Sequence, residues 1–214
     1  MLGTYLLVVI GPGSVVAVAQ SGFPPTESLL IVALVFGAVV AGVIVLLGPM
    51  SGAIINPALT LASAAAGLLR KSLVIPYIAF QIAGALVAGF TLEVAFGGTH
   101  SASYLGSTKL APGISPVQGT AIEVAGTFVL ALAALTASTF LNNRFAQALL
   151  VGSTLFVLIM VIGPLTGASF NPARSLGPSV FAGYFGNQLV YYVGPFTGGL
   201  LAGLTFTGAK SLAK

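Results

Sequence analysis

The sequence predicts an all-α integral membrane protein with six transmembrane helices, two re-entrant half-helices and an inverted three-helix repeat. Of its 214 residues, 57% are hydrophobic and 5% are charged, and the mean hydropathy is +1.10. A soluble core of this size cannot bury so much apolar surface. The apolar residues form segments of about 20, the length that crosses a bilayer. Two shorter apolar segments each begin with Asn-Pro-Ala, and these predict the half-helices.

The composition excludes several classes of function. A net charge of +4 is too small to indicate a nucleic-acid partner, and the absence of cysteine excludes a disulfide framework, a thiolate metal site and a cysteine nucleophile. The single histidine, His100, lies in a segment rich in Gly and Ser and is expected to be a solvated loop residue rather than a pH sensor. Paired carboxylates are missing too, so we expect no enzyme activity, no metal and no cofactor.

Six apolar segments are long enough to span the membrane. They comprise residues 2–18, 29–47, 73–96, 120–140, 145–162 and 188–207. The first has no basic residue ahead of it, so we expect a span there and not a cleaved signal peptide. Gly11-Pro12-Gly13 is expected to interrupt this span. Residues 97–116, which are rich in Gly, Ser and Pro, are expected to form the longest extramembrane loop.

The two half-helices are expected at about residues 56–69 and 171–181. Asn56 and Asn171 are favoured N-caps, and proline suits the first helical position, where its missing N–H would have no partner. The residues that open the half-helices are Pro57, Ala58, Pro172 and Ala173. At about 1.5 Å per residue, such segments reach about half of a roughly 30 Å hydrocarbon layer. Each must therefore dip in from one side.

The Asn-Pro-Ala segments belong to an internal repeat. SGAIINPALTLA, residues 51–62, aligns with TGASFNPARSLG 115 positions later, and GALVAG at 84–89 aligns with GGLLAG at 198–203. We therefore expect one membrane domain, residues 1–214, with repeats at about 1–96 and 119–214 joined by a loop at 97–118. Three spans per repeat is an odd number, so the second copy is inverted and the half-helices meet near the midplane. Four glycines of the repeat predict close helix packing: Gly84, Gly89, Gly198 and Gly203.

The distribution of charge predicts the orientation. Six spans place five basic residues on one side: Arg70, Lys71, Arg144, Lys210 and Lys214. The other side receives Glu27, Glu93 and Lys109. The positive-inside rule then puts both termini in the cytoplasm. We expect a multi-pass protein of the cell membrane that is in contact with lipid.

Two half-helices that point at one central spot favour the passage of neutral solutes. Each helix N-terminus carries roughly half a positive charge, which repels cations, and asparagine amides donate to the oxygen of a passing water or alcohol. Arg174 costs about 3 kcal/mol to place in a membrane, so it is expected to face a cavity. The alternative, extension of the side chain to a lipid headgroup, is disfavoured because Leu59 occupies the matching position of the first repeat and the asymmetry indicates a function. The competing class, an ion-coupled transporter, needs carboxylates in its spans, and only Glu123 and Glu93 qualify.

Over almost its whole length the chain resembles the aquaporins, or major intrinsic proteins. The resemblance is carried by SGAIINPALT and TGASFNPARSLGP, with support from EVAGTF at 123–128, QIAGA at 81–85 and YYVGPFTGG at 191–199. It implies six tilted helices, two half-helices and one pore per subunit of a homotetramer. It also implies central donors at Asn56 and Asn171. For Glu123 it implies a carboxylate that accepts hydrogen bonds from the backbone of the half-helix loop, while an interfacial acid near a helix N-terminus, stabilised by the helix dipole, stays open as the alternative. The outer constriction that it implies comprises Phe36, Ile159, Ala168 and Arg174.

Departures from the family pattern bear on selectivity. Water-selective members commonly have histidine where this chain has Ile159, so the resemblance implies a wider and more apolar constriction, as in archaeal-type members. Glycerol-conducting members usually have aspartate in place of Ser175, and proline plus an aliphatic residue in place of Tyr191-Tyr192. On balance we expect a water channel that excludes ions and protons. Small neutral solutes as additional cargo, or a glycerol facilitator, stay open as alternatives.

Three further departures concern single residues. Ile54 replaces a histidine that often lies two residues before the first asparagine, which removes a polar contact near the inner pore. Glu123 has no counterpart in the first repeat, where the matching position would precede Met1. Ala168 stands where many mercury-sensitive members have cysteine, so we expect the channel to be insensitive to mercurials.

Overall fold

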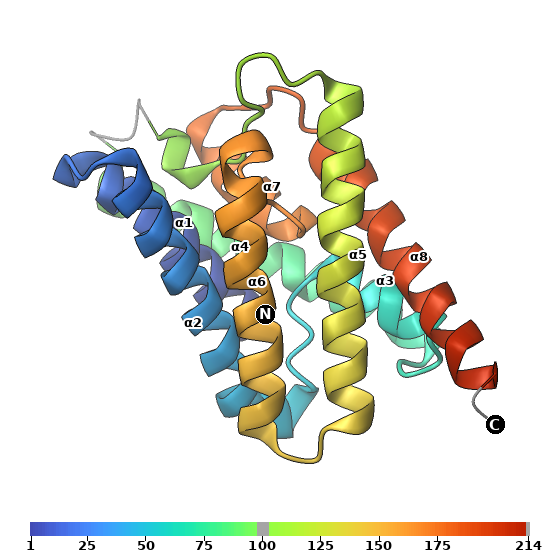
Figure 1. Ribbon diagram of the computed structural model, residues 1–214. Helices are drawn as coiled ribbons and strands as arrows, with labels where there is room; N and C mark the ends of the chain where they lie inside the picture. The colour runs from blue at the N-terminus through green and yellow to red at the C-terminus, as the bar shows by residue number, and fades with distance from the viewer. Residues whose placement is uncertain (98–102, 213–214) are drawn as a thin grey trace.

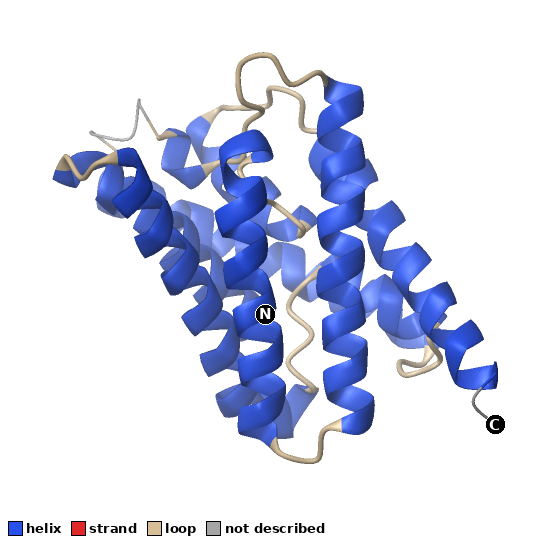
Figure 2. Cartoon of the chain, viewed as in Figure 1, coloured by secondary structure: helices blue, strands red, loops and turns tan. Residues whose placement is uncertain are grey.

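The chain folds into helices throughout the part that the structure describes. This computed structural model describes residues 1–97 and 103–212 (Figures 1 and 2). Its α-helices are α1 (Leu2–Ser21), α2 (Pro25–Ser51), α3 (Pro57–Ala65), α4 (Val74–Phe96), α5 (Pro116–Phe140), α6 (Arg144–Thr166), α7 (Pro172–Ala182) and α8 (Val190–Leu212). Two short 3-10 helices lie in connections: η1 (Lys71–Leu73) and η2 (Tyr104–Gly106). The predicted all-α fold is confirmed, while His100 and Lys214 lie outside the described residues.

Six of these helices are long, and each corresponds to one predicted span. Five of them, α1, α2, α4, α5 and α6, are long and apolar enough to cross a membrane. α8 has 23 residues, which reach about 35 Å, but its glycines, threonines and tyrosines make it less apolar. Several helices extend beyond the predicted apolar segment. α5, for example, begins earlier than predicted because a capping box between Ser115 and Gln118 starts the helix.

The predicted interruption at Gly11-Pro12-Gly13 is wrong, because α1 runs through it without a break. Proline is tolerated inside membrane helices, and the Ser14 hydroxyl adds a bond to the Gly11 carbonyl at 2.6 Å in the same turn. A Cβ added at Gly11 would lie 2.5 Å from the ring of Phe36. The missing side chain of Gly11 therefore provides the space that the Phe36 ring occupies. The segment helps to position Phe36 and does not end the helix.

The half-helices α3 and α7 each pack mainly on the last long helix of the other repeat. α3 lies against α8, and α7 lies against α4 (Figure 1). A Cβ at Gly203 would lie 2.5 Å from the Ala62 carbonyl oxygen, and one at Gly89 would collide with the Gly177 carbonyl. The predicted close packing is thus confirmed for all four glycines, Gly84, Gly89, Gly198 and Gly203. α3 ends before the predicted Leu69 because Gly67 takes a φ of 71°, which stops the helix.

The connection between α4 and α5, which the sequence predicts to be extramembrane, packs in part against the helices. Among its described residues, Leu105 is fully buried, and η2 contacts both α1 and α7. Gly106 takes a φ of 73°, and an added Cβ would lie 2.5 Å from the Pro12 carbonyl oxygen. Glycine alone permits this conformation and this approach without strain. The connection therefore folds back into the bundle, toward the place where α7 begins.

Two of the described basic residues, Arg144 and Lys210, lie toward one end of the bundle, opposite to Lys109. The α5–α6 connection, where Arg144 begins α6, and the C-terminal end of α8, which carries Lys210, lie together at the bottom of Figure 1. The connection before α5, which carries Lys109, lies at the opposite end (Figure 1). This separation agrees with the charge asymmetry of the sequence. The orientation in the membrane stays a prediction.

Candidate pore

Asn56 and Asn171 cap the two half-helices. The Asn56 side-chain oxygen accepts from the backbone N–H of Ala58 at 2.8 Å, and the Asn171 oxygen accepts from that of Ala173 at 3.0 Å. Pro57 and Pro172 occupy the first helical positions, where no N–H is needed. Both amide oxygens are thus used within their own helices, and each helix presents its positive end to the other.

The same two amides tie the repeats together. Nδ2 of Asn56 donates to the Phe170 carbonyl at 2.7 Å, and Nδ2 of Asn171 donates to the Ile55 carbonyl at 3.2 Å. Each acceptor belongs to the residue just before the other asparagine. An amide nitrogen carries two hydrogens, so each asparagine keeps one after this bond. A molecule lying between the half-helices therefore meets amide donors from both asparagines, whose oxygens are already engaged.

Glu123 holds the second pore loop. Its Oε1 accepts from the Thr166 hydroxyl at 2.7 Å and from the Ser169 N–H at 3.0 Å, and its Oε2 accepts from the Phe170 N–H at 2.8 Å. The side chain is fully buried, so Glu123 is not an interfacial acid. These bonds hold Phe170 at a φ of 51°, a left-handed conformation that costs a non-glycine residue about 1–3 kcal/mol. The carboxylate thus fixes the carbonyl that anchors Asn56.

Neutral side chains hold the first pore loop. Nε2 of Gln81 donates to the Ile54 carbonyl at 2.8 Å and to the Thr60 hydroxyl at 2.9 Å. The Thr4 hydroxyl donates to the Ile55 carbonyl at 3.3 Å. Gln81 is 2% exposed, and sequence analysis noted it only as part of a motif. A lone glutamine in an apolar span is the signal that points to this supporting role, because such a group needs buried partners.

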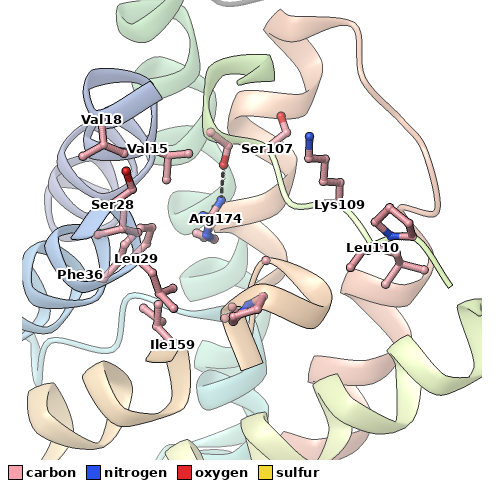
Figure 3. A pocket seen from close by; sticks show the side chains of 18 residues that line it. Val15, Val18, Ser28, Leu29, Phe36, Ser107, Lys109, Leu110, Ile159 and Arg174 are labelled. Carbon is pink, nitrogen blue, oxygen red and sulfur yellow. Dashed lines mark hydrogen bonds between the residues drawn. The ribbon is translucent and has the colours of Figure 1, made fainter. Parts of the chain in front are cut away.

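The four residues predicted for the outer constriction lie around one cavity of about 410 Å³: Phe36, Ile159, Ala168 and Arg174 (Figure 3). Nη1 of Arg174 donates to the Gly106 carbonyl at 2.8 Å, drawn as a dashed line in Figure 3. The guanidinium carbon lies 4.9 Å from the centre of the Phe36 ring. Nε of Arg174 has no partner among the described groups. The arginine is 3% exposed and lines the cavity instead of extending to a lipid headgroup.

Three adjacent cavities mark a path between the repeats. The outer one measures about 410 Å³, the central one about 40 Å³ and the inner one about 230 Å³. The outer and central cavities share Phe36, Ala168 and Arg174. The central and inner cavities share Val40, Ile55, Leu59 and Val151. Asn56 and Asn171 line the central cavity, which is the smallest of the three and lies where the two half-helices meet.

Some of the residues that the family resemblance links to selectivity do not line this path but lie behind its wall. In the described part of the chain, Ser175 lines none of the three cavities and is fully buried. Tyr191 donates its hydroxyl to the Thr166 carbonyl at 2.9 Å, and Tyr192 lines a separate cavity of about 110 Å³. Ile54, by contrast, lines the inner cavity. Ser175 and the tyrosine pair therefore influence passage only through their neighbours.

Sequence analysis misses two glycines that support the constriction. Gly106 supplies the acceptor for Arg174, and Gly11 leaves room for the ring of Phe36. Gly106 and Arg174 are 68 residues apart, so no local pattern links them. Within residues 1–97 and 103–212, no group of three or more His, Cys, Asp or Glu side chains could hold a metal ion.

Comparisons with known proteins identify the family. Residues 1–206 match the family described as Major intrinsic protein. The chain is 36% identical over 206 residues to Aquaporin NIP1-2 of Oryza sativa subsp. japonica; the match covers 92% of this chain and 66%, just under two thirds, of that protein. It is 32% identical over 230 residues to Aquaporin AqpM of Methanothermobacter marburgensis, with 96% and 93% covered.

A solved structure shows the same fold. The aquaglyceroporin from Plasmodium falciparum matches with a TM-score of 0.83 at 22% identity, over 97% of this chain and 90% of that one. The chain therefore belongs to the major intrinsic protein family, the aquaporins, and is a multi-pass membrane channel for water or small solutes and not an enzyme.

Proposed function

We propose that this channel conducts water and excludes ions and protons. The pairing of Asn56 and Asn171 in the central cavity carries the proposal. A water molecule between them accepts from both amides and directs its own hydrogens outward, toward the outer and inner cavities. The hydrogen bonds on the two sides then run in opposite directions. A proton finds no continuous chain of hydrogen bonds to follow.

Electrostatics supports the exclusion of ions. Among the described residues, the three cavities have no acidic lining side chain, while Arg174 and Lys109 line the outer one. The two half-helix ends add roughly half a positive charge each. Cations are therefore repelled. Anions lose their water shell in a central cavity of about 40 Å³ whose wall includes Leu7, Leu130 and Leu155.

A second candidate function is the passage of small neutral solutes such as glycerol. The outer constriction places Phe36 and Ile159 on the wall of the same cavity as the donor groups of Arg174. A polyol has carbon on one side and hydroxyl groups on the other, and it matches this division between apolar and donating surface. Ile159, in place of a polar residue, is the observation that favours this cargo.

A comparison of wild type with Ile159→His separates the two functions. Stopped-flow light scattering on proteoliposomes measures osmotic water and glycerol permeability. We expect wild type to conduct water far above empty liposomes and to admit glycerol more slowly. We expect Ile159→His to reduce glycerol entry while water flux persists, because the imidazole narrows the apolar side of the cavity. Val117→His, at a position 80% exposed at the start of α5, is the matched control.

Each outcome of this comparison decides one point. Water flux no faster than through empty liposomes contradicts the proposed function. Glycerol entry that is negligible in both wild type and Ile159→His removes the second candidate and leaves a water channel. Glycerol entry that the histidine abolishes shows that the missing imidazole sets the filter.

Mercurial block tests the position of Ala168. Ala168 lines both the outer and central cavities, and the chain has no cysteine. We expect HgCl₂ to leave wild-type water flux unchanged and to block Ala168→Cys, with recovery on addition of a thiol. Val193→Cys, on a residue 51% exposed on α8, serves as the control and should not be blocked. An unblocked Ala168→Cys channel would place this residue away from the conducting path.

The assembly and orientation are part of the same proposal. We propose a homotetramer in the cell membrane. Each subunit consists of repeats 1–96 and 119–214 joined by the loop 97–118, and both of its termini lie in the cytoplasm. The matching order of α1–α4 and α5–α8 supports the repeat. Large apolar side chains on the outside, such as Ile75, Phe90 and Phe145, support contact with lipid or a neighbouring subunit. The basic end of the bundle supports the orientation.

A further inference from the structure

Three buried hydroxyl groups form a chain behind the constriction. Thr108 Oγ1 lies 2.8 Å from Ser175 Oγ, and Ser175 Oγ lies 2.6 Å from Ser169 Oγ. The Ser169 hydroxyl donates to the Asn171 carbonyl at 3.1 Å. Thr108 is 1% exposed, Ser175 is fully buried and Ser169 is 4% exposed. These bonds are therefore shielded from water. They join the segment between α4 and α5 to α7, the half-helix that carries Arg174.

The hydrogens of this chain have a fixed direction. Each hydroxyl carries one hydrogen, and that of Ser169 is used on the Asn171 carbonyl. Ser175 must therefore donate to Ser169, and Thr108 must donate to Ser175. The donor at position 108 is consequently essential to the chain, while the methyl group of the threonine is not.

The segment that Thr108 anchors also holds Arg174. Gly106, two residues earlier, accepts from Nη1 of Arg174 at 2.8 Å. Ser107 and Lys109 line the outer cavity (Figure 3). Thr108 between them belongs instead to the buried hydroxyl chain. Among the described residues, no other hydrogen bond holds the guanidinium, and its Nε has no partner. The position of the Gly106 carbonyl therefore determines where the guanidinium lies.

The first repeat uses the same position in a parallel way. Thr60, which matches Ser175 in the alignment of the repeats, binds Gln81 through its hydroxyl, and Gln81 holds the first pore loop. In both halves of the chain, the residue four positions after the asparagine of Asn-Pro-Ala thus uses its hydroxyl to bind a neighbouring segment. Thr60 fastens a long helix, whereas Ser175 fastens a connection.

We infer that Thr108 and Ser175 are positioning residues that set the place of Arg174, and with it the solute selectivity, from behind the pore wall. This inference rests on the proposed role of Arg174 in the constriction. Without the Thr108 hydroxyl, the segment loses a fixed point next to Gly106, and the arginine gains freedom to withdraw from the path. Larger neutral solutes then pass more easily, while water, which already fits, gains less.

Permeability measurements on two near-isosteric variants test the inference. Thr108→Val removes the hydroxyl and keeps the shape, and Thr108→Ser keeps the hydroxyl and removes the methyl group. We expect Thr108→Val to raise the glycerol-to-water permeability ratio about fivefold, the factor that one neutral hydrogen bond contributes to an equilibrium. Thr108→Ser should stay at the wild-type ratio. Thr91→Val, whose hydroxyl donates to the Val87 carbonyl of its own helix, is the control.

Three further variants make each outcome decisive. Ser175→Ala removes the middle hydroxyl of the chain, and the double variant with Thr108→Val should show no more than the larger single effect, since both remove one network. Arg174→Val is the reference. If Arg174→Val raises the ratio and Thr108→Val lowers only the thermal stability, the inference is wrong and the proposed function stands. If Arg174→Val leaves the ratio unchanged, the proposed constriction fails and the inference fails with it.

Discussion

Replacing Glu123 by glutamine is expected to reduce water permeability to nearly that of empty liposomes. The two carboxylate oxygens accept from three donors in the second pore loop. In glutamine one oxygen becomes an N–H₂ group, which faces the backbone N–H of Phe170 or of Ser169 whichever way the amide turns. A buried donor without an acceptor costs about 1–3 kcal/mol. The Phe170 carbonyl then shifts, and it is the anchor of Asn56.

Stopped-flow water flux and thermal unfolding in detergent measure this effect together. For a chain of this size, each kcal/mol lowers the unfolding temperature by about 2–4 °C, so the variant should remain folded at room temperature while its pore is distorted. Glu27→Gln makes the same change on an exposed residue in the first turn of α2 and should have no effect on flux. Wild-type flux through Glu123→Gln would show that the loop keeps its shape without the carboxylate.

The features that sequence predicts well are those with a local physical cause. Asn56 followed by proline is enough to predict the start of a helix, because the capping oxygen and the missing N–H act within a few residues. Arg174 in an apolar segment predicts a cavity, because the cost of burying its charge is high wherever it lies. The close packing of Gly84 and Gly203 likewise follows from their small size and their repetition.

Features that depend on distant partners escape such reasoning. The bond from Asn56 to the Phe170 carbonyl joins residues 114 apart, and that from Arg174 to Gly106 joins residues 68 apart. Gly106 resembles any loop glycine until the backbone of Pro12 lies beside it. Pro12 itself suggests a break, because sequence does not show which neighbours surround it in the bundle. The pore walls can be predicted from motifs, whereas the groups that hold them require the fold.

Replacing Arg174 by valine is expected to remove much of the barrier to ions and to admit larger neutral solutes. Its guanidinium lines both the outer and central cavities beside the ring of Phe36. The half-helix ends together carry roughly one positive charge, so the arginine supplies roughly half of the fixed positive charge along the narrow part of the path. A unit charge at about 4 Å repels a cation by about 4 kcal/mol where the effective dielectric constant is about 20. Valine removes this repulsion and shortens the side chain.

Decay of an imposed pH gradient across proteoliposomes, recorded with an entrapped pH-sensitive dye, measures the proton leak, and glycerol-induced swelling measures the size limit. We expect both to rise in Arg174→Val, with glycerol permeability increasing more than water permeability, while the leak stays below that of an open pore because the half-helix ends remain. Arg70→Val, an exposed position before η1, should match wild type in both measurements. A variant that stays tight to protons while admitting glycerol would assign the electrostatic barrier to the half-helix ends and the size limit to Arg174. An unchanged channel would contradict the place of Arg174 in the constriction, because a buried charge on the lining of two successive cavities must alter what passes between them.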